Sequence, residues 1–303
     1  MSQIFDALQR SEAAHAGTEA SRTEPTFPVA TELLEAAERK RRGSSAASVV
    51  GPDHAHSLEQ FPSLPFSILP ESRLVSVAEE ESLGAEKFRF LGVRLRQLRQ
   101  SRPLKKVLIT STIPQEGKST VAANLACTLG RRKQHKTLLL EGDLRRPTVA
   151  QKFGLGKVPG LSEWLRGESE TMHVYRLETL GLWVMPAGSA PENPLELLQS
   201  GKLSSLMNQF TEWFDWIIID SPPLLPLADT SIWARLADGT LLVTRKGITE
   251  KEQLRRGLQV LERSKFLGAL VNGSSDAAHT DYYQRYGPAA SSPQSLRSAS
   301  KRS

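Results

Sequence analysis

The chain has 303 residues, 39% hydrophobic and 24% charged, which is typical of a globular protein and excludes collagen, coiled coil and wholesale disorder. Its apolar runs are too short for a membrane-spanning helix, and its single cysteine excludes an internal disulfide or a cysteine-based zinc site. Lys and Arg number 39 against 33 Asp and Glu, a mild excess that does not by itself indicate nucleic-acid binding. The N-terminus lacks the features of a secretory signal, so we expect the chain in the cytosol.

Three zones of different composition follow one another along the chain. Residues 1–81 form an N-terminal extension, in which Ile4, Phe5 and Leu8 predict a short amphipathic helix over 2–14. A second helix is expected over 31–41, and the rest of this zone has the Pro- and Ser-rich composition of a linker. Residues 82–274 form the folded domain, and residues 275–303 form a flexible polar tail.

Apolar runs alternate with helical patterns in the folded zone. Short continuous apolar runs predict strands that are covered on both faces, at 106–110, 137–141, 182–186, 215–220, 240–244 and 267–271. Helices are predicted at 86–100, 118–130, 160–166, 194–211, 228–237 and 250–264. This alternation predicts an α/β fold with a mostly parallel central sheet flanked by helices on both faces.

A phosphate-binding loop is the most informative motif. Residues 111–120, STIPQEGKST, lie between a predicted strand and a predicted helix and match the P-loop pattern, with Thr112 at the position of the first glycine. In such a loop Gly117 lets the backbone approach phosphate, Lys118 lies between the β- and γ-phosphates, and the Ser119 hydroxyl is a Mg²⁺ ligand. We therefore expect ATP and Mg²⁺ here, bound by Thr112, Pro114, Gln115, Glu116, Gly117, Lys118, Ser119 and Thr120. The alternative is a strand-to-helix turn with an exposed lysine.

Two acidic strand ends are expected beside this loop, because ligands of an open parallel sheet lie outside the carboxyl ends of its strands. The sequence WIIIDSPP puts Asp220 at one strand end, where its carboxylate can hold the water shell of Mg²⁺. The sequence EGDLRRP puts Glu141 and Asp143 at another, directly before Arg145 and Arg146. A solvated turn is the alternative interpretation of each.

Together these motifs resemble the bacterial tyrosine kinases of capsule and exopolysaccharide production, which share a P-loop fold with MinD/ParA-like ATPases. That family has a Walker A motif S-x-x-P-x-E-G-K-S, matched by residues 111–119. Its second acidic motif, D-x-D-x-R-x-P, is matched at 141–147 with Glu141 in the first position, and its Walker B motif D-[ST]-P-P by residues 220–223. The resemblance covers residues 86–273, and the opening MSQIFDALQRSE is also similar to polysaccharide-export autokinases.

The resemblance implies an ATP-dependent protein-tyrosine kinase. Its catalytic residues would be Lys118, Glu141, Asp143 and Asp220, and its Mg²⁺ ligands Ser119, Asp143 and Asp220. Arg145 would bind the nucleotide, and Asn272 would lie near the adenine. Either Glu141 or Asp143 would orient or deprotonate the acceptor tyrosine. If Glu141 is this base, Glu141→Asp should preserve or raise activity.

The acceptors implied by the resemblance lie in the tail. Family kinases are phosphorylated in trans on a C-terminal tyrosine cluster, here Tyr282, Tyr283 and Tyr286 of DYYQRYG. Phosphates on this cluster would repel an acidic cleft and release a homo-oligomer, a cycle suited to the control of polysaccharide polymerisation and export. The implied activator is a membrane polysaccharide co-polymerase, a Wzz-type chain-length determinant, at the inner face of the plasma membrane. No nucleic acid is implied.

Two positions depart from the family pattern. Glu141 replaces an aspartate, and its extra methylene moves the carboxylate by roughly an ångström. Gly92 stands where the assembly motif E-x-x-R-x-x-R has its second arginine, after Glu86 and Arg89. Two alternatives therefore remain. One is a MinD/ParA-like ATPase switch, whose signature lysine is replaced here by Ile113; the other is a non-catalytic nucleotide-binding regulator of a polysaccharide co-polymerase.

Overall fold

The structure is a computed structural model that describes residues 58–132, 134–225 and 228–273. The helices predicted over 2–14 and 31–41 lie outside these residues, as does the tyrosine cluster of the tail. None of the helices in the described ranges is both long enough and apolar enough to cross a membrane.

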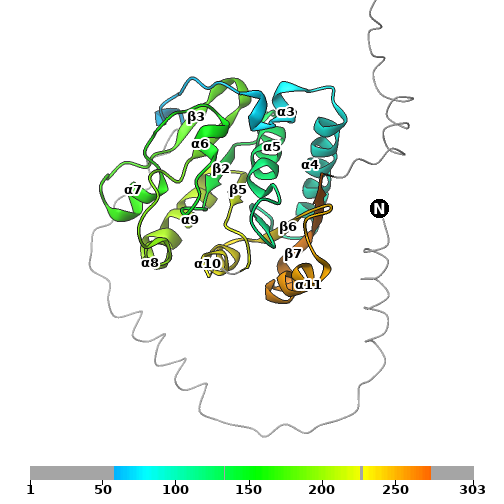
Figure 1. Ribbon diagram of the computed structural model, residues 1–303. Coiled ribbons are helices and arrows are strands. Elements are labelled where there is room, and N and C mark those ends of the chain that lie inside the picture. Colours follow the sequence, from blue (N-terminus) through cyan, green and yellow to red (C-terminus); the bar gives the residue numbers. More distant parts are fainter. Residues whose placement is uncertain (1–57, 133, 226–227, 274–303) are drawn as a thin grey trace, which may run out of the picture. The chain divides into compact units, whose positions relative to one another are not determined.

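Seven strands form one sheet at the centre of the described part of the chain (Figure 1). Their spatial order is β3-β4-β2-β5-β1-β6-β7, and all neighbours are parallel except β3 and β4. The strands are β1 (Lys106–Ser111), β2 (Thr137–Glu141), β3 (Tyr175–Leu177), β4 (Leu182–Met185), β5 (Trp216–Asp220), β6 (Gly239–Arg245) and β7 (Phe266–Asn272). The α/β prediction is confirmed. Only β3 was not predicted, because three residues are too few to show a periodic pattern.

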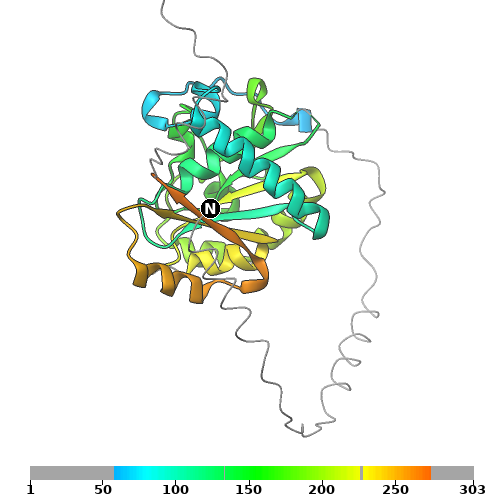
Figure 2. The ribbon, with the colours of Figure 1, turned by 90° about the vertical axis from the view of Figure 1, so that its right-hand side faces the viewer.

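Helices cover both faces of the sheet, and β7 forms one edge of it (Figure 2). They are α3 (Val75–Ala78), α4 (Leu83–Ser101), α5 (Lys118–Gly130), α6 (Val149–Lys152), α7 (Leu161–Arg166), α8 (Pro194–Gln199), α9 (Gly201–Trp213), α10 (Asp229–Leu236) and α11 (Lys251–Val260). The helix predicted over 194–211 is two helices, because Ser200 has an extended ψ of 138°. The Ser82 hydroxyl caps α4 by accepting the Ala85 N–H at 3.1 Å.

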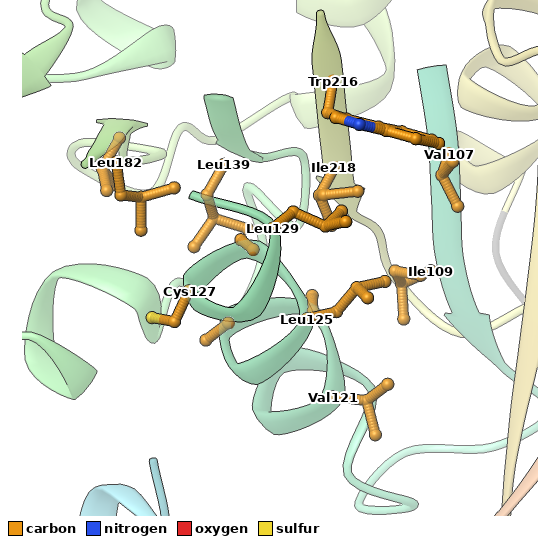
Figure 3. Close-up of a cluster of buried hydrophobic side chains, with 14 of the residues drawn as sticks. Val107, Ile109, Val121, Leu125, Cys127, Leu129, Leu139, Leu182, Trp216 and Ile218 are labelled. Carbon is orange, nitrogen blue, oxygen red and sulfur yellow. The ribbon is translucent and has the colours of Figure 1, made fainter. Parts of the chain in front are cut away.

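The strand residues alternate between two apolar clusters, as the period of a strand requires. On β1, Val107 and Ile109 pack towards α4 and α5, whereas Leu108 packs towards the cluster that includes α7 to α10. Figure 3 shows Leu125 and Leu129 of α5 facing Ile109 and Ile218 of the sheet. Cys127 is fully buried in the same cluster, as expected for a small core residue. This packing fixes the helix that follows the phosphate loop.

The segment before α4 is part of the folded unit, although its Pro-rich composition predicted a linker. Leu58, Phe61 and Leu74 are buried in the two main clusters. The segment also extends the sheet edge: the Leu64 N–H donates to the Arg176 carbonyl at 3.1 Å, and the Arg176 N–H to the Pro62 carbonyl at 2.9 Å. Prolines are compatible with such an edge, because one side of an edge strand needs no N–H donors.

The strand register gathers the sequence motifs at one edge of the sheet. Asp220 on β5 is paired with Glu141 on β2 and with Ile109 on β1. Because the three strands are parallel, their carboxyl ends lie side by side. The phosphate loop after β1, the acidic turn after β2 and the carboxylate that ends β5 therefore meet at the same place.

Candidate active site

The phosphate loop is shaped by one buried glutamate. Glu116 Oε2 accepts the Ile113 N–H at 2.9 Å, and Glu116 Oε1 accepts the Thr249 hydroxyl. Its carbonyl accepts the Asn272 side-chain amide at 3.0 Å. Glu116 therefore binds to groups from within the loop and from the segments after β6 and at the end of β7, which fixes the loop before any ligand arrives.

Gly117 is required at the turn into α5. Its φ is 94°, and a Cβ built at this position would lie 2.1 Å from Asn272 Nδ2. A side chain here would therefore be strained and would also displace Asn272. The preceding residue, Gln115, is also left-handed with φ 66°, and its carbonyl accepts Arg245 Nη1 at 3.1 Å.

Lys118 lies among the acidic strand ends. Its ammonium is 2.9 Å from Asp143 Oδ2 and 3.4 Å from Ser119 Oγ, and both Lys118 and Asp143 are mostly buried. Burial by itself lowers the pKa of Lys118, but the carboxylates of Asp220, Asp143 and Glu141 outweigh it, so the net pKa is raised. The lysine is thus held in its charged form at the start of α5.

Asp220 is completely buried, and neither carboxylate oxygen forms a hydrogen bond of normal geometry among the described residues, although the Ser119 hydroxyl lies close enough to lower its pKa. Burial raises the pKa of this carboxyl, and the charge of Lys118 opposes the rise. A buried carboxylate with so few donors is costly, and a cation or a water-bearing ligand would lower this cost.

Glu141 is bound very differently from Asp220. Its Oε1 accepts the Thr148 N–H and, at 2.8 Å, the Val149 N–H, and its Oε2 accepts the Ala187 N–H at 2.9 Å. Burial raises the pKa of Glu141 to about 7, although the three N–H donors favour the charged form. Both oxygens therefore join the start of α6 to the segment after β4.

The turn after β2 is held by α10. Arg145 forms a two-point ion pair with Asp229, Nε to Oδ2 at 2.7 Å and Nη2 to Oδ1 at 3.2 Å. Trp233 Nε1 donates to the Gly142 carbonyl at 3.1 Å, and a Cβ on Gly142 would lie 2.5 Å from the indole. These contacts position Asp143, which lies between Gly142 and Arg145.

A cleft of about 1030 Å³ opens beside these groups, a size that suits a small-molecule ligand. Among the described residues that line it, two are acidic, Glu71 and Asp143, and seven are basic. The basic residues are Arg73, Lys87, Lys118, Arg145, Arg146, Lys152 and Arg245. The prediction of an acidic cleft is therefore wrong. The prediction considered only the strand ends, whereas cations from the surrounding segments dominate the lining.

The structure brings most of the predicted site residues to this cleft. Those that line it are Pro114, Gln115, Gly117, Lys118, Ser119, Thr120, Asp143, Arg145 and Asn272. Asp220 and Glu141 lie buried behind the lining. Thr112 and Glu116 are also buried, outside the lining, and support the loop from within.

Five cationic lining residues were not among the predicted site residues: Arg73, Lys87, Arg146, Lys152 and Arg245. Arg73 and Lys87 belong to the segments before the first predicted strand, which carry no motif that points to phosphate. Lys152 is nine residues after Asp143, at the end of the short helix α6. Only the tertiary contacts of α6 bring it to the cleft, so no sequence pattern could have identified it.

Comparison with known proteins identifies the family. No protein-family model matches the chain. The chain is 37% identical to tyrosine-protein kinase YwqD of Bacillus subtilis over 215 residues, which cover 70% of this chain and 90% of the relative. It is 34% identical to tyrosine-protein kinase CpsD of Streptococcus pneumoniae serotype 4 over 173 residues, 56% of this chain and 76% of the relative.

A solved structure agrees with these relatives. The kinase domain of the Escherichia coli tyrosine kinase ETK superposes with a TM-score of 0.60 at 27% identity, over 67% of this chain and 82% of that one. This fold likeness and the sequence identity to YwqD each extend over about two thirds of the chain or more. The chain belongs to the bacterial tyrosine kinases, enzymes that act as protein-tyrosine kinases.

Proposed function

We propose that the chain is an ATP-dependent autokinase that phosphorylates Tyr282, Tyr283 and Tyr286 in the tail of a neighbouring copy. The observation that carries this proposal is the buried charge cluster at the sheet edge. Lys118 is paired with Asp143 at a cleft of nucleotide size, and Asp220, whose oxygens accept no hydrogen bond of normal geometry among the described residues, lies buried behind them. Phosphoryl transfer needs this combination of a phosphate-binding cation and carboxylates that hold a metal ion.

The residues at the cleft fit Mg²⁺. Asp220 offers two oxygens that accept no hydrogen bond of normal geometry from the described residues, and the nearby Ser119 adds a hydroxyl that lowers the pKa of Asp220. Mg²⁺ prefers such oxygen ligands and keeps several waters, so it does not need a cage of side chains. The described residues contain no group of three His, Cys, Asp or Glu side chains placed to hold a metal ion, so most ligands of Mg²⁺ would be water and phosphate oxygens. Bound Mg²⁺ would neutralise charge on the phosphate chain.

The chain's own residues would bind and orient the nucleotide. Backbone N–H groups around Gly117 and the start of α5 would receive phosphate oxygens, and Arg145 would add charge at the rim. Asn272 would stand near the adenine. Lys118 would exchange Asp143 for phosphate oxygens when the nucleotide binds. This would free Asp143 Oδ2 to take a proton, while Asp143 Oδ1 keeps the Arg146 N–H at 3.1 Å.

Asp143 is the better candidate for the base that accepts the tyrosine proton. It lines the cleft, whereas Glu141 is completely buried and accepts three backbone N–H groups. A base must reach the proton that it abstracts, and both Glu141 oxygens are already occupied by the backbone. We therefore assign the proton transfer to Asp143 and a positioning role to Glu141.

The tail would enter the cleft of a neighbouring copy. The last described residues, Asn272 and Gly273, line the cleft, which is why we propose a cleft as the binding site of the tail that follows them. Each phosphotyrosine would carry nearly two negative charges. Because the lining is basic, release of the phosphorylated tail cannot rely on repulsion by the cleft. It would rely on repulsion among the phosphates of neighbouring tails.

The assembly and its biological role are part of the same proposal. On α4, Phe90 and Val93 are exposed beside the Glu86–Arg89 ion pair, which suits contact with another copy. Gly92 faces Leu129 of α5, so the missing arginine would not have lain on the exposed face. The folded domain would extend to about residue 274. A Wzz-type membrane co-polymerase would activate the kinase at the inner face of the membrane, and tail phosphorylation would regulate exopolysaccharide polymerisation and export.

Lys118→Met tests the kinase assignment. Purified protein incubated with Mg²⁺ and ATP should accumulate phosphotyrosine, and Lys118→Met should reduce it at least a hundredfold, because the phosphate-binding charge is lost. The change also leaves Asp143 and Asp220 without their cation, so thermal unfolding must be measured in parallel. Lys118→Arg keeps the charge and should therefore keep the stability of the parent, so a loss of activity in this variant reports on catalysis and not on folding. Lys157→Met, at an exposed position outside the cleft, is the matched control.

Two other outcomes would identify the alternatives. ATP hydrolysis without phosphotyrosine would favour the ATPase switch. Nucleotide binding without either product would favour the non-catalytic regulator, and the kinase proposal would be abandoned.

Glu141 variants separate a base from a positioning residue. Aspartate is too short to reach both Ala187 and the start of α6, and glutamine would present an NH₂ group to a backbone donor. Both Glu141→Asp and Glu141→Gln should therefore lower stability by roughly 1–3 kcal/mol. Asp143→Asn should instead lower kcat by on the order of a hundredfold or more with a smaller effect on unfolding. Full or higher activity and unchanged unfolding in Glu141→Asp would restore Glu141 as the base.

Removal of residues 281–303 tests the acceptor site. The truncated chain should lose most phosphate incorporation and keep its affinity for ADP, because three of the four tyrosines lie in the removed segment. The fourth, Tyr175, is 7% exposed and donates its hydroxyl to the Pro159 carbonyl at 3.1 Å, so it is a poor acceptor. Full-length Lys118→Met should then be phosphorylated by the truncated chain. Unchanged incorporation after truncation, measured by intact mass, would move the acceptor elsewhere.

A further inference from the structure

Lys152 is a cation of the cleft that has no place in the phosphate-loop motifs. Its ammonium forms no ion pair with any described residue. It donates hydrogen bonds to Thr120 Oγ1 at 2.9 Å and to the Ser72 carbonyl at 3.5 Å. It is half-buried and lines the cleft. A lysine that is withdrawn from water without a carboxylate partner is costly unless a ligand provides the charge.

The surroundings of Lys152 increase this cost. Burial lowers the pKa of its ammonium, and the like charges of Arg73 and Lys118 lower it further, although Asp220 and Glu141 oppose the shift. Arg73 lines the same cleft and also forms no ion pair within the described part of the chain. An anion between these cations would relieve the repulsion.

Two buried groups hold Lys152 and Arg73 in place. Glu141 binds the N–H groups of Thr148 and Val149 and so fixes α6, the helix that ends at Lys152. On the other side, Asn124 of α5 donates to the Arg73 carbonyl at 2.9 Å and accepts the Ser76 N–H at 2.9 Å. Arg73 itself has a left-handed φ of 53°, a conformation that a non-glycine residue keeps only where its surroundings enforce it.

We propose that Lys152 is a second phosphate-binding lysine, which contacts an oxygen of the nucleotide's phosphate chain from the side of Thr120 while Lys118 contacts it from the side of Asp143. Arg73 adds positive charge to the same side. This inference rests on the proposed function, because it takes the ligand of the cleft to be ATP. It also gives Glu141 a purpose: the carboxylate positions the helix that carries Lys152.

Binding of ADP with Mg²⁺, measured by calorimetry, tests the proposal. Lys152→Gln should weaken ADP binding about tenfold or more, since a charge-assisted contact with phosphate is lost. Lys152→Arg should stay within a few fold of the parent, because it keeps the charge. Lys157→Gln, on the same segment but outside the cleft, should bind ADP like the parent. Without nucleotide, Lys152→Gln should unfold at the same or a higher temperature, because a poorly compensated charge has been removed.

Several results would overturn the proposal. Unchanged ADP affinity in Lys152→Gln would do so, as would a lower unfolding temperature of that variant without nucleotide, which would indicate a structural role. Free phosphotyrosine serves as a competitor against ADP: if Lys152→Gln weakened only this competition, the lysine would bind the phosphate of the product instead. If the parent chain bound no ADP, the proposed function itself would fail. If the parent bound ADP and formed phosphotyrosine but Lys152→Gln matched it, this inference alone would fail.

Discussion

The buried contact between the Lys118 ammonium and the acidic strand ends determines how the rest of this molecule is arranged. Lys118 lies 2.9 Å from Asp143 and within electrostatic range of Asp220. This requires three parallel strands in one register, so that β1, β2 and β5 end at the same edge. It also requires α5 to begin directly after the loop, which the packing of Leu125 and Leu129 on the sheet secures (Figure 3).

The charged groups at the cleft are arranged to bind a ligand, and this arrangement lowers the stability of the ligand-free protein. Asp220 accepts no hydrogen bond of normal geometry within the described residues, and Lys152 has no carboxylate in contact. The nearby opposite charges offset only part of the desolvation cost of each group, and a bound ligand would offset more. By contrast, the groups that shape the site are fully bonded. Glu116 and Glu141 are buried carboxylates whose oxygens all accept hydrogen bonds. In a preorganised active site, the polar groups that would contact the ligand typically lack protein partners, whereas the groups that support them are fully hydrogen-bonded.

Much of this organisation could be predicted from the sequence, because it depends on local patterns. The run of apolar residues that ends at Asp220 predicts a buried strand, and the loop before Lys118 predicts a phosphate site from Gly117 and its spacing. The role of Glu141 could not be predicted, because its partners Thr148, Val149 and Ala187 meet it only through tertiary contacts. The basic character of the cleft could not be predicted either, because it also depends on tertiary contacts. Arg73 is nearly eighty residues from Lys152 in the chain, and only folding brings both to one cleft.

The most direct test of this account is the unfolding temperature of Asp220→Asn with and without Mg²⁺ and ADP. Asparagine has nearly the same shape and removes the buried charge, while Lys118 keeps Asp143 as a partner. The account predicts that the nucleotide-free variant unfolds at the same temperature as the parent or a few degrees higher. It also predicts that the stabilisation by Mg²⁺ and ADP seen in the parent is largely lost. A variant that is less stable without nucleotide, yet is stabilised by Mg²⁺ and ADP as strongly as the parent, would contradict it.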